Sequence, residues 1–349
     1  MIKTQNNLIP VLSIDNIPLM PTTYVRAKKL IEQNKATPFK KLNLLCIKLK
    51  FEINNSSEQK EKIVIGIDPG SKKEAYTVKS KKNTYLNIQC DAIGYVKDKM
   101  VSRSQSRRKR RQSLRFRQPR FNNRGNSTRK NRLPPSTKAR WQLKINIIKQ
   151  LMLIYPITDI IIEDIKAVSK EGKKRWNKSF SPLEQGKKYF KEQIELLQLQ
   201  YHQIEGYNTY KLRQNLHLSK SKDKLSEGFD AHCVDSWVIA NSIVGGHSTP
   251  AHTKILFLQP IQVNRRSLHK QQHTFGNGSP NKNPRLRTGG TISLGLKKNS
   301  IVKWKTKKYN EICLVGGFDE KTTKLSLVVL SGKNKNGKSD NRITRSAKI

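Results

Sequence analysis

Short apolar runs separated by polar turns predict a chain that alternates between strands and helices. In the first third, the predicted strands are residues 9–14, 42–51, 63–67, 74–78 and 85–95, with a helix at 24–33 and a stiff turn at 18–21. Short turns join the last three strands, which favours an antiparallel meander. The polar stretch 54–57 is typical of a linker, so residues 1–55 are expected to form a small unit of their own.

The remainder of the chain is predicted to hold helices first and a small β domain last. Helices are expected at 141–153, 182–199 and 231–244, strands at 157–165 and 203–207, and a polar loop at 166–179. From about residue 250 the chain is basic and rich in Gly and Asn, with strand-like runs at 291–296, 312–315 and 324–330. Residues from Gly332 onward are expected to be disordered.

Composition limits the classes of partner. Of 349 residues, 70 are Lys or Arg and 25 are Asp or Glu, which gives a formal net charge of +45. Such an excess favours phosphate backbones through counterion release, so the expected partner is a nucleic acid. No apolar run approaches the roughly 20 residues of a membrane-spanning helix, and no secretory signal opens the chain, so no membrane partner is expected. The four cysteines form no C-x-x-C pair, which argues against a zinc finger or a disulfide framework.

The segment 101–140 contains fifteen Lys or Arg residues and no Asp or Glu. Arg103, Arg107 and Arg111 recur at every fourth position, and other basic side chains surround the axis of the implied helix. A helix charged on all sides suits insertion between nucleic-acid strands, although blocks of this kind are often disordered nucleic-acid-binding tails. Phe116 and Phe121 are candidates for base stacking and equally for anchoring the helix to the protein. The residues expected to bind nucleic acid are Arg103, Arg107, Arg108, Lys109, Arg110, Arg111, Arg115, Arg117, Arg120 and Arg124.

Three acidic residues lie where an acid is locally costly. Asp68 ends an apolar strand, Glu163 follows three isoleucines, and Asp235 lies among apolar residues of a predicted helix. Phosphodiester cleavage by two metal ions about 4 Å apart needs about three carboxylates from different elements. The three acids therefore predict a shared Mg²⁺ site, with Mn²⁺ as a possible substitute. His232 lies three residues before Asp235, on the same predicted helical face, and would assist proton transfer or orient the attacking water.

Each of these residues also has a simpler interpretation. Asp68 precedes Pro-Gly, where an Asp is often only a turn former, and Glu163 would also suit an ion pair with an Arg of the basic segment. Asp235 and His232 lie in the first turn of the predicted helix, where an acid is favoured by the helix dipole. Asp164 and Asp230 are acidic neighbours that resemble the candidates. The set is more persuasive than any single member.

The order of several motifs resembles the transposon-encoded IscB/IsrB family, relatives of the ancestors of CRISPR type II effectors. In chain order these motifs are Pro18-Leu19-Met20-Pro21, Ile65-Gly66-Ile67-Asp68-Pro69-Gly70, the R-R-x-R-R run Arg107–Arg111, Leu133-Pro134-Pro135-Ser136, Glu163 in its isoleucine strand, and Ala231-His232-Cys233-Val234-Asp235. In the tail, Gly289–Gly295 and Val315–Asp319 resemble the family's C-terminal DNA-reading domain. Between Lys166 and Asp230 there are two histidines and no cysteine, so an inserted HNH nuclease is not expected. The chain therefore resembles the IsrB type.

The resemblance implies an α/β fold, an RNase H-like RuvC domain split by an arginine-rich bridge helix. The implied layout is an N-terminal PLMP-like α+β domain at 1–55, RuvC segments at 60–100, 133–166 and 230–260, the bridge helix at 101–132, a connection at 167–229, and a basic β-rich C-terminal domain at 261–349. That last domain would read a short DNA motif beside the target. Asp68, Glu163 and Asp235 would bind magnesium with the help of His232.

The implied activity is RNA-guided nicking of the displaced, non-target DNA strand. The partners would be a structured guide RNA and double-stranded target DNA, held in a monomeric ribonucleoprotein. Two other functions remain open, a RuvC-like DNA nuclease that needs no guide and a non-catalytic RNA- or DNA-binding protein. Abundant Lys, Asn, Ile and Gln indicate an AT-rich genome, hence the cytoplasm or nucleoid of a bacterium, or the stroma or matrix of an organelle.

Overall fold

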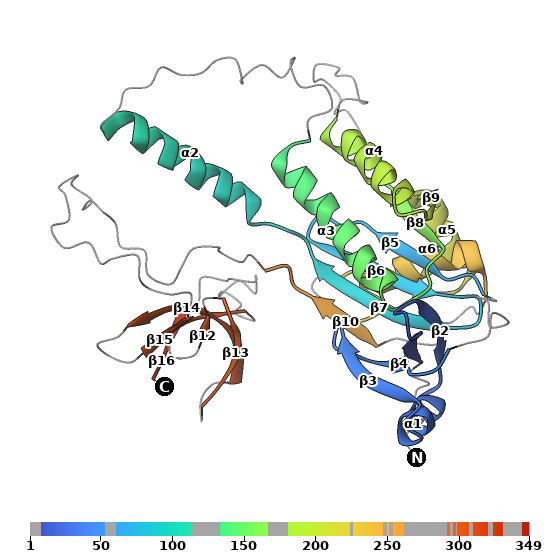
Figure 1. Cartoon of the computed structure of the whole chain (residues 1–349). Coiled ribbons are helices and arrows are strands. Elements are labelled where there is room, and N and C mark those ends of the chain that lie inside the picture. The colour runs from blue at the N-terminus through green and yellow to red at the C-terminus, as the bar shows by residue number, and fades with distance from the viewer. Residues whose placement is uncertain are drawn as a thin grey trace, which may run out of the picture. The chain divides into compact units, whose positions relative to one another are not determined.

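The computed structural model in Figure 1 describes most of the chain. The described residues are 8–52, 61–113, 133–166, 181–223, 226–246, 250, 254–261, 292–293, 296–297, 299–306, 310–319, 324–330 and 344–348. Two compact units are present, one formed by residues 1–105 and 118–260, the other by residues 106–117 and 261–349. Each unit has a sheet and a hydrophobic core of its own.

A six-stranded mixed sheet forms the centre of the first unit, in the order β10-β7-β6-β5-β8-β9. Its strands are β5 (Val64–Asp68), β6 (Lys73–Lys79), β7 (Thr84–Asp91), β8 (Asp159–Asp164), β9 (Gln200–Glu205) and β10 (Ile255–Leu258). The predicted antiparallel meander is confirmed by β5, β6 and β7, while β8 and β9 add to β5 in parallel and β10 adds to β7 in parallel. The α/β class is confirmed, and the arrangement is consistent with an α/β nuclease fold.

Helices α3 (Pro135–Met152) and α4 (Pro182–Glu195) pack against each other and cover one face of this sheet. Figure 1 shows the two helices side by side. Their apolar side chains, among them Trp141 and Phe190 with ring centroids 5.0 Å apart, pack on isoleucines of β5 and β8. Both helices were predicted from apolar spacing, and α3 begins at Pro135, six residues before the predicted start.

Helix α6 (Cys233–Val244) packs on the opposite face, against β5, β6, β7 and β8. Gly66, in the middle of β5, permits the close approach. A Cβ at Gly66 would lie 2.2 Å from the carbonyl oxygen of Ser236 and 2.6 Å from the backbone nitrogen of Ala240. Any side chain at this position would displace the helix. The Ser236 hydroxyl is also hydrogen bonded to Thr77 of β6 over 2.7 Å, so the start of α6 is fixed on the sheet.

The N-terminal residues form a smaller sheet in the order β2-β1-β4-β3, with one helix. Its elements are β1 (Ile9–Leu12), β2 (Pro18–Thr22), α1 (Tyr24–Glu32), β3 (Ala36–Lys41) and β4 (Leu44–Leu49). The turn predicted at 18–21 is wrong, because these residues pair with β1 as an edge strand, where proline is tolerated. Buried Cys46 of this sheet packs into the core of the six-stranded sheet.

Two elements complete the first unit. Helix α2 (Val96–Ser113) contains the start of the basic segment, and the boundary between the units falls within it, after Gln105. Helix α5 (Gly206–Asn215) follows β9 directly. The strand predicted at 203–207 ends at Glu205 because Gly206 begins this helix, which the sequence pattern does not predict. The loop predicted at 166–179 lies outside the described residues, except for Lys166.

The second unit contains the predicted β-rich C-terminal part. A two-stranded ribbon, β11 (Ile292–Ser293) and β12 (Leu296–Lys297), precedes an antiparallel sheet of β13 (Ile301–Lys305), β14 (Asn310–Asp319), β15 (Lys324–Val329) and β16 (Thr344–Lys348). The tail expected to be disordered from Gly332 is wrong for residues 344–348, because they pair with β15 along its length. Within the described part of the chain, no helix combines the length and apolarity needed to span a membrane.

Candidate functional site

Two of the predicted acids lie next to each other at one edge of the six-stranded sheet. Asp68 is the last residue of β5, and Glu163 is the last but one of β8. The two strands run in parallel with Ile67 paired to Ile162, so each acid follows a paired isoleucine. Their carboxyl groups are hydrogen bonded to each other. The sequence pattern placed Asp68 at the end of an apolar strand and Glu163 after three isoleucines within another, and the parallel register explains why the two acids meet.

The third acid reaches the same place from α6. Asp235 lies in the first turn of this helix and is buried, with 4% of its surface exposed. Because Gly66 brings α6 against β5, Asp235 lies close enough to Asp68 and Glu163 for its charge to affect both. The structure thus brings together residues that are far apart along the chain.

Electrostatic repulsion within this acidic site is strong. Burial, together with the neighbouring charges of Glu163 and Asp235, raises the pKa of Asp68 to about 8. Burial also raises the pKa of Glu163, although its hydrogen bond to Asp68 acts in the opposite direction. Lys220 lowers the pKa of both acids by electrostatic attraction. Without a further cation, the site therefore favours a proton shared by Asp68 and Glu163 over full ionisation.

Two cations that the sequence analysis did not select neutralise Asp235. Arg213 Nη1 lies 2.5 Å from Oδ1, and the Lys220 ammonium forms an ion pair with Oδ2. Arg213 belongs to α5, and this helix also contacts Glu163, since a Cβ at Gly206 would lie 2.5 Å from Glu163 Oε1. No local motif marks these residues, because the contacts depend on how α5 packs on α6 and β8.

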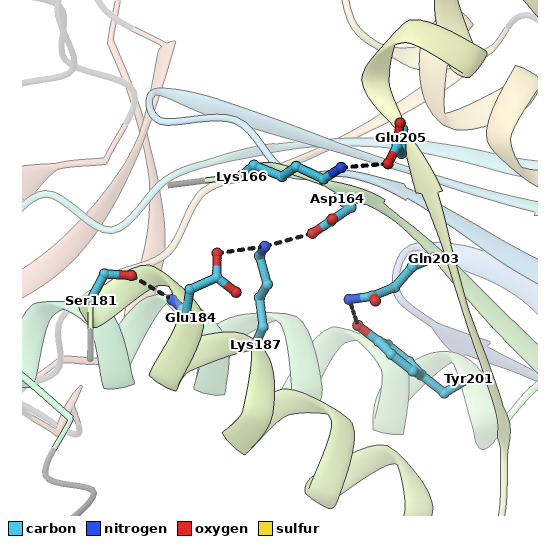
Figure 2. A network of polar contacts seen from close by, with 8 residues as sticks. All are labelled: Asp164, Lys166, Ser181, Glu184, Lys187, Tyr201, Gln203 and Glu205. Carbon is cyan, nitrogen blue, oxygen red and sulfur yellow. Dashed lines mark hydrogen bonds and ion pairs between the residues drawn. The ribbon is translucent and has the colours of Figure 1, made fainter. Parts of the chain in front are cut away.

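Asp164, the neighbour of Glu163, belongs to a different network, shown in Figure 2. Successive side chains of a strand point to opposite faces of the sheet, so Asp164 points to the α4 face. There its carboxylate lies 2.5 Å from Nζ of Lys187, which is also hydrogen bonded to Glu184 over 2.9 Å. Ser181 caps the start of α4 by accepting a hydrogen bond from the Glu184 amide. Asp164 therefore forms an ion pair with a lysine, whereas Glu163 is hydrogen bonded to another acid.

His232 occupies the N-cap position immediately before α6 and is partly buried. Its φ and ψ of −133° and −39° are those of the N-cap residue that precedes the regular helix. Asp230, the other acidic neighbour, is exposed. The expected assistance of His232 in proton transfer stays a prediction.

Among the residues that the structure describes, no three His, Cys, Asp and Glu side chains are arranged as a ready-made metal site. The donor set nevertheless fits a hard divalent cation, since three carboxylates from three elements supply only oxygen ligands. The raised pKa values of Asp68 and Glu163 indicate that the site lacks positive charge. A cation would relieve that repulsion, provided that Lys220 and Arg213 release Asp235.

The predicted basic helix is confirmed as far as the structure describes it. Helix α2 extends to Ser113, and Arg103, Arg107 and Arg108 are exposed on it. Lys109, Arg110 and Arg111 lie within the same helix. The remaining residues of this prediction lie outside the described part of the chain, and they are Arg115, Arg117, Arg120, Arg124, Phe116 and Phe121.

Part of the chain matches a known protein family. Residues 9–175 match the family described as RRXRR protein, a domain characteristic of IscB/IsrB-type nucleases. The match suggests a nuclease that acts with nucleic acids. It includes Asp68, the whole of α2 and Glu163, whereas Asp235 lies beyond it. No curated protein is significantly similar to the chain in sequence.

Proposed function

We propose that the protein is an RNA-guided, magnesium-dependent DNA endonuclease of the IsrB type, which nicks the displaced non-target strand. The observation that supports this most is the meeting of Asp68, Glu163 and Asp235 at one edge of a mixed sheet. Asp235 lies outside the segment that matches the RRXRR family, so its position beside the two matched acids is independent support. The strand order and the helices on both faces fit an RNase H-like RuvC domain.

The proposed chemistry is phosphodiester hydrolysis at the acidic site. Asp68, Glu163 and Asp235 would hold the divalent cations, and Mg²⁺ there would activate water and stabilise the leaving oxygen. Lys220 and Arg213 would then be available to the phosphates of the bound strand, since both carry their charge at the site. His232 would orient the attacking water or move its proton.

The exposed arginines of α2 support an RNA partner within this proposal. Arg103, Arg107 and Arg108 lie on a helix that begins shortly after β7 along the chain. Their charges would bind the guide RNA and its heteroduplex through phosphates, which contributes affinity with little sequence choice. Neutralising Arg107, Arg108, Arg110 and Arg111 together is expected to abolish the retention of RNA during purification.

The test combines RNA sequencing with a cleavage assay. The protein is purified with its bound RNA, the RNA is sequenced, and a plasmid that matches the guide is incubated with Mg²⁺. We expect one dominant non-coding RNA and a nick in the non-target strand. Cleavage without RNA would favour the guide-independent nuclease, and salt-sensitive binding without any cleavage would favour a non-catalytic binding protein.

A pair of neighbouring residues supplies the matched control. Glu163→Gln should reduce nicking by about 10³-fold, because metal-assisted charge stabilisation contributes several kcal/mol. Asp164→Asn changes the next residue of the same strand, which faces Lys187 on the other side of the sheet, and should leave nicking within a few-fold of wild type. Equal activity of the two variants would contradict the proposed site.

A further inference from the structure

Helix α5 carries two exposed tyrosines that have no part in the proposed hydrolysis. Tyr207 is 64% exposed and Tyr210 is 51% exposed, and their spacing of three places them on the same side of the helix. A cation accompanies each ring. Lys211 Nζ lies 4.6 Å from the ring centroid of Tyr207, and the Arg213 guanidinium lies 5.5 Å from that of Tyr210. Two aromatic rings flanked by two cations form a surface suited to an anionic ligand with flat apolar groups.

The same helix is also a wall of the acidic site. Its first residue, Gly206, lies against the Glu163 carboxylate, and Arg213 near its end forms the ion pair with Asp235. Thr209, between them, is buried and is hydrogen bonded to the carbonyl oxygen of Glu205. One side of α5 therefore faces the acids, and the two tyrosines lie next to that side. Because one helix carries both, a ligand on the tyrosines would lie a fixed, short distance from the acids.

We infer that Tyr207 and Tyr210 form a stacking platform for unpaired bases of the nucleic-acid strand whose backbone enters the acidic site. This inference rests on the proposed function and specifies its substrate as single-stranded. Bases of a duplex are stacked on one another and are not accessible to exposed rings, whereas every unpaired base offers a face. Lys211 would bind a phosphate of the same strand, and the net charge of +45 favours a polyanion over an apolar protein partner.

The first experiment is photocrosslinking, because other basic surfaces also contribute to affinity. The full-length protein is mixed with a single-stranded oligonucleotide containing 5-iodouridine, in the presence of EDTA so that no cleavage occurs. After irradiation, crosslinked peptides are identified by mass spectrometry. We expect crosslinks at Tyr207 or Tyr210. Crosslinks confined to other parts of the chain would overturn the inference.

The second experiment measures affinity by fluorescence anisotropy with a labelled oligothymidylate. Replacing both tyrosines by Ala should weaken binding roughly tenfold or more, because each stacked base contributes substantially. The dependence of affinity on salt should not change, since no phosphate contact is lost. Replacing both by Phe should preserve affinity, and Tyr24→Ala, at a 55% exposed tyrosine of α1, should have no effect.

The outcomes separate this inference from the proposed function. Both binding measurements work without cleavage, so a wild-type protein that never cuts DNA would contradict the proposed function alone. Unchanged affinity of the double Ala variant, with an unchanged melting temperature, would overturn the platform even if the wild type cuts. If the double variant loses guide RNA instead of the oligothymidylate, the tyrosines bind the guide and the inference is wrong.

Discussion

The two faces of the six-stranded sheet hold acids in opposite ways. On the α3 face, Glu74 is buried with one ammonium, Lys144, at 2.5 Å, and the Tyr76 hydroxyl donates a hydrogen bond to its other oxygen over 2.7 Å. On the α6 face, Asp68, Glu163 and Asp235 share Lys220 and Arg213. In the first group, one ammonium neutralises the single carboxylate, and both carboxylate oxygens have a partner. The second has three acids and two cations, and the pKa values of Asp68 and Glu163 are raised.

This difference distinguishes buried acids that stabilise the fold from buried acids that can bind a ligand. A buried carboxylate with a matched cation and full hydrogen bonding fixes α3 on the sheet and offers nothing to a ligand. An acidic site with unmet negative charge costs stability and binds a cation strongly when one is supplied. The α6 face is therefore expected to be less stable alone and more responsive to metal than the α3 face.

The largest effect on stability is expected on the balanced face. Lys144→Met leaves Glu74 buried without its counter-ion, which should lower the free energy of unfolding by about 3–5 kcal/mol. Lys149→Met, at an exposed lysine of the same helix, should change it by less than about 0.5 kcal/mol. Urea unfolding followed by circular dichroism measures both. If Lys144→Met lowers the free energy of unfolding no more than its control does, the proposed difference between the two faces of the sheet is wrong.

The close packing of α6 gives the next effect. Gly66→Ala places a methyl group against the backbone of Ser236 and Ala240, which should cost about 1–3 kcal/mol and displace Asp235 from the other acids. Gly94→Ala is the control, because no atom lies within 4 Å of a Cβ there. Gly66→Ala should lower both the free energy of unfolding in urea and the nicking activity. Wild-type values in both assays would show that the approach of α6 to β5 is unimportant.

Apolar spacing predicts strands β5 to β9 of the six-stranded sheet but not β10, and the candidate acids could be selected because acids are rare among apolar residues. Sequence spacing could not predict α5, since Gly206–Asn215 is rich in polar residues and has little apolar periodicity. It also could not predict the partners of Asp235, because Arg213 of α5 and Lys220 of the segment after α5 meet it only through tertiary packing.

Two other differences between the predicted and the observed elements have local causes. Pro18 and Pro21 suggest a turn, but an edge strand has amide positions that need no partner, so β2 accommodates both. The last strand, β16, is short and flanked by Lys, Asn, Gly and Ser, a composition typical of disorder. The local sequence does not predict this strand, because β16 is stabilised by its pairing with β15.

Competition between Lys220 and a metal ion gives a smaller effect. Lys220→Met removes one of the two cations held by Asp235 and should raise the affinity for Mn²⁺ about three- to tenfold, the equivalent of one partly exposed charged hydrogen bond. Lys222→Met, at an exposed lysine nearby, is the matched control and should bind as the wild type does. Calorimetric titration measures both. Weaker binding in Lys220→Met would show that this ammonium does not compete with the metal.

Another effect concerns the dependence of stability on pH. The pKa of Asp68 is raised in the folded state, so the folded, metal-free protein holds more protons than the unfolded chain between the ordinary pKa and about 8. Stability should therefore fall as the pH rises from about 5 to about 8, and Asp68→Asn should flatten that slope. Urea midpoints in EDTA provide the measurement. An equally steep slope in Asp68→Asn would contradict the assignment of the raised pKa.

The most direct test of the α6 face as a cation site is a Mn²⁺ titration followed by electron paramagnetic resonance. Wild-type protein and Asp164→Asn should bind Mn²⁺ alike, because Asp164 contacts Lys187 on the other face. Glu163→Gln should bind at least tenfold more weakly while melting at or above the wild-type temperature, since it removes an acid whose pKa is raised. Equal Mn²⁺ affinity in all three proteins would contradict the central claim that the three acids form a metal-dependent site.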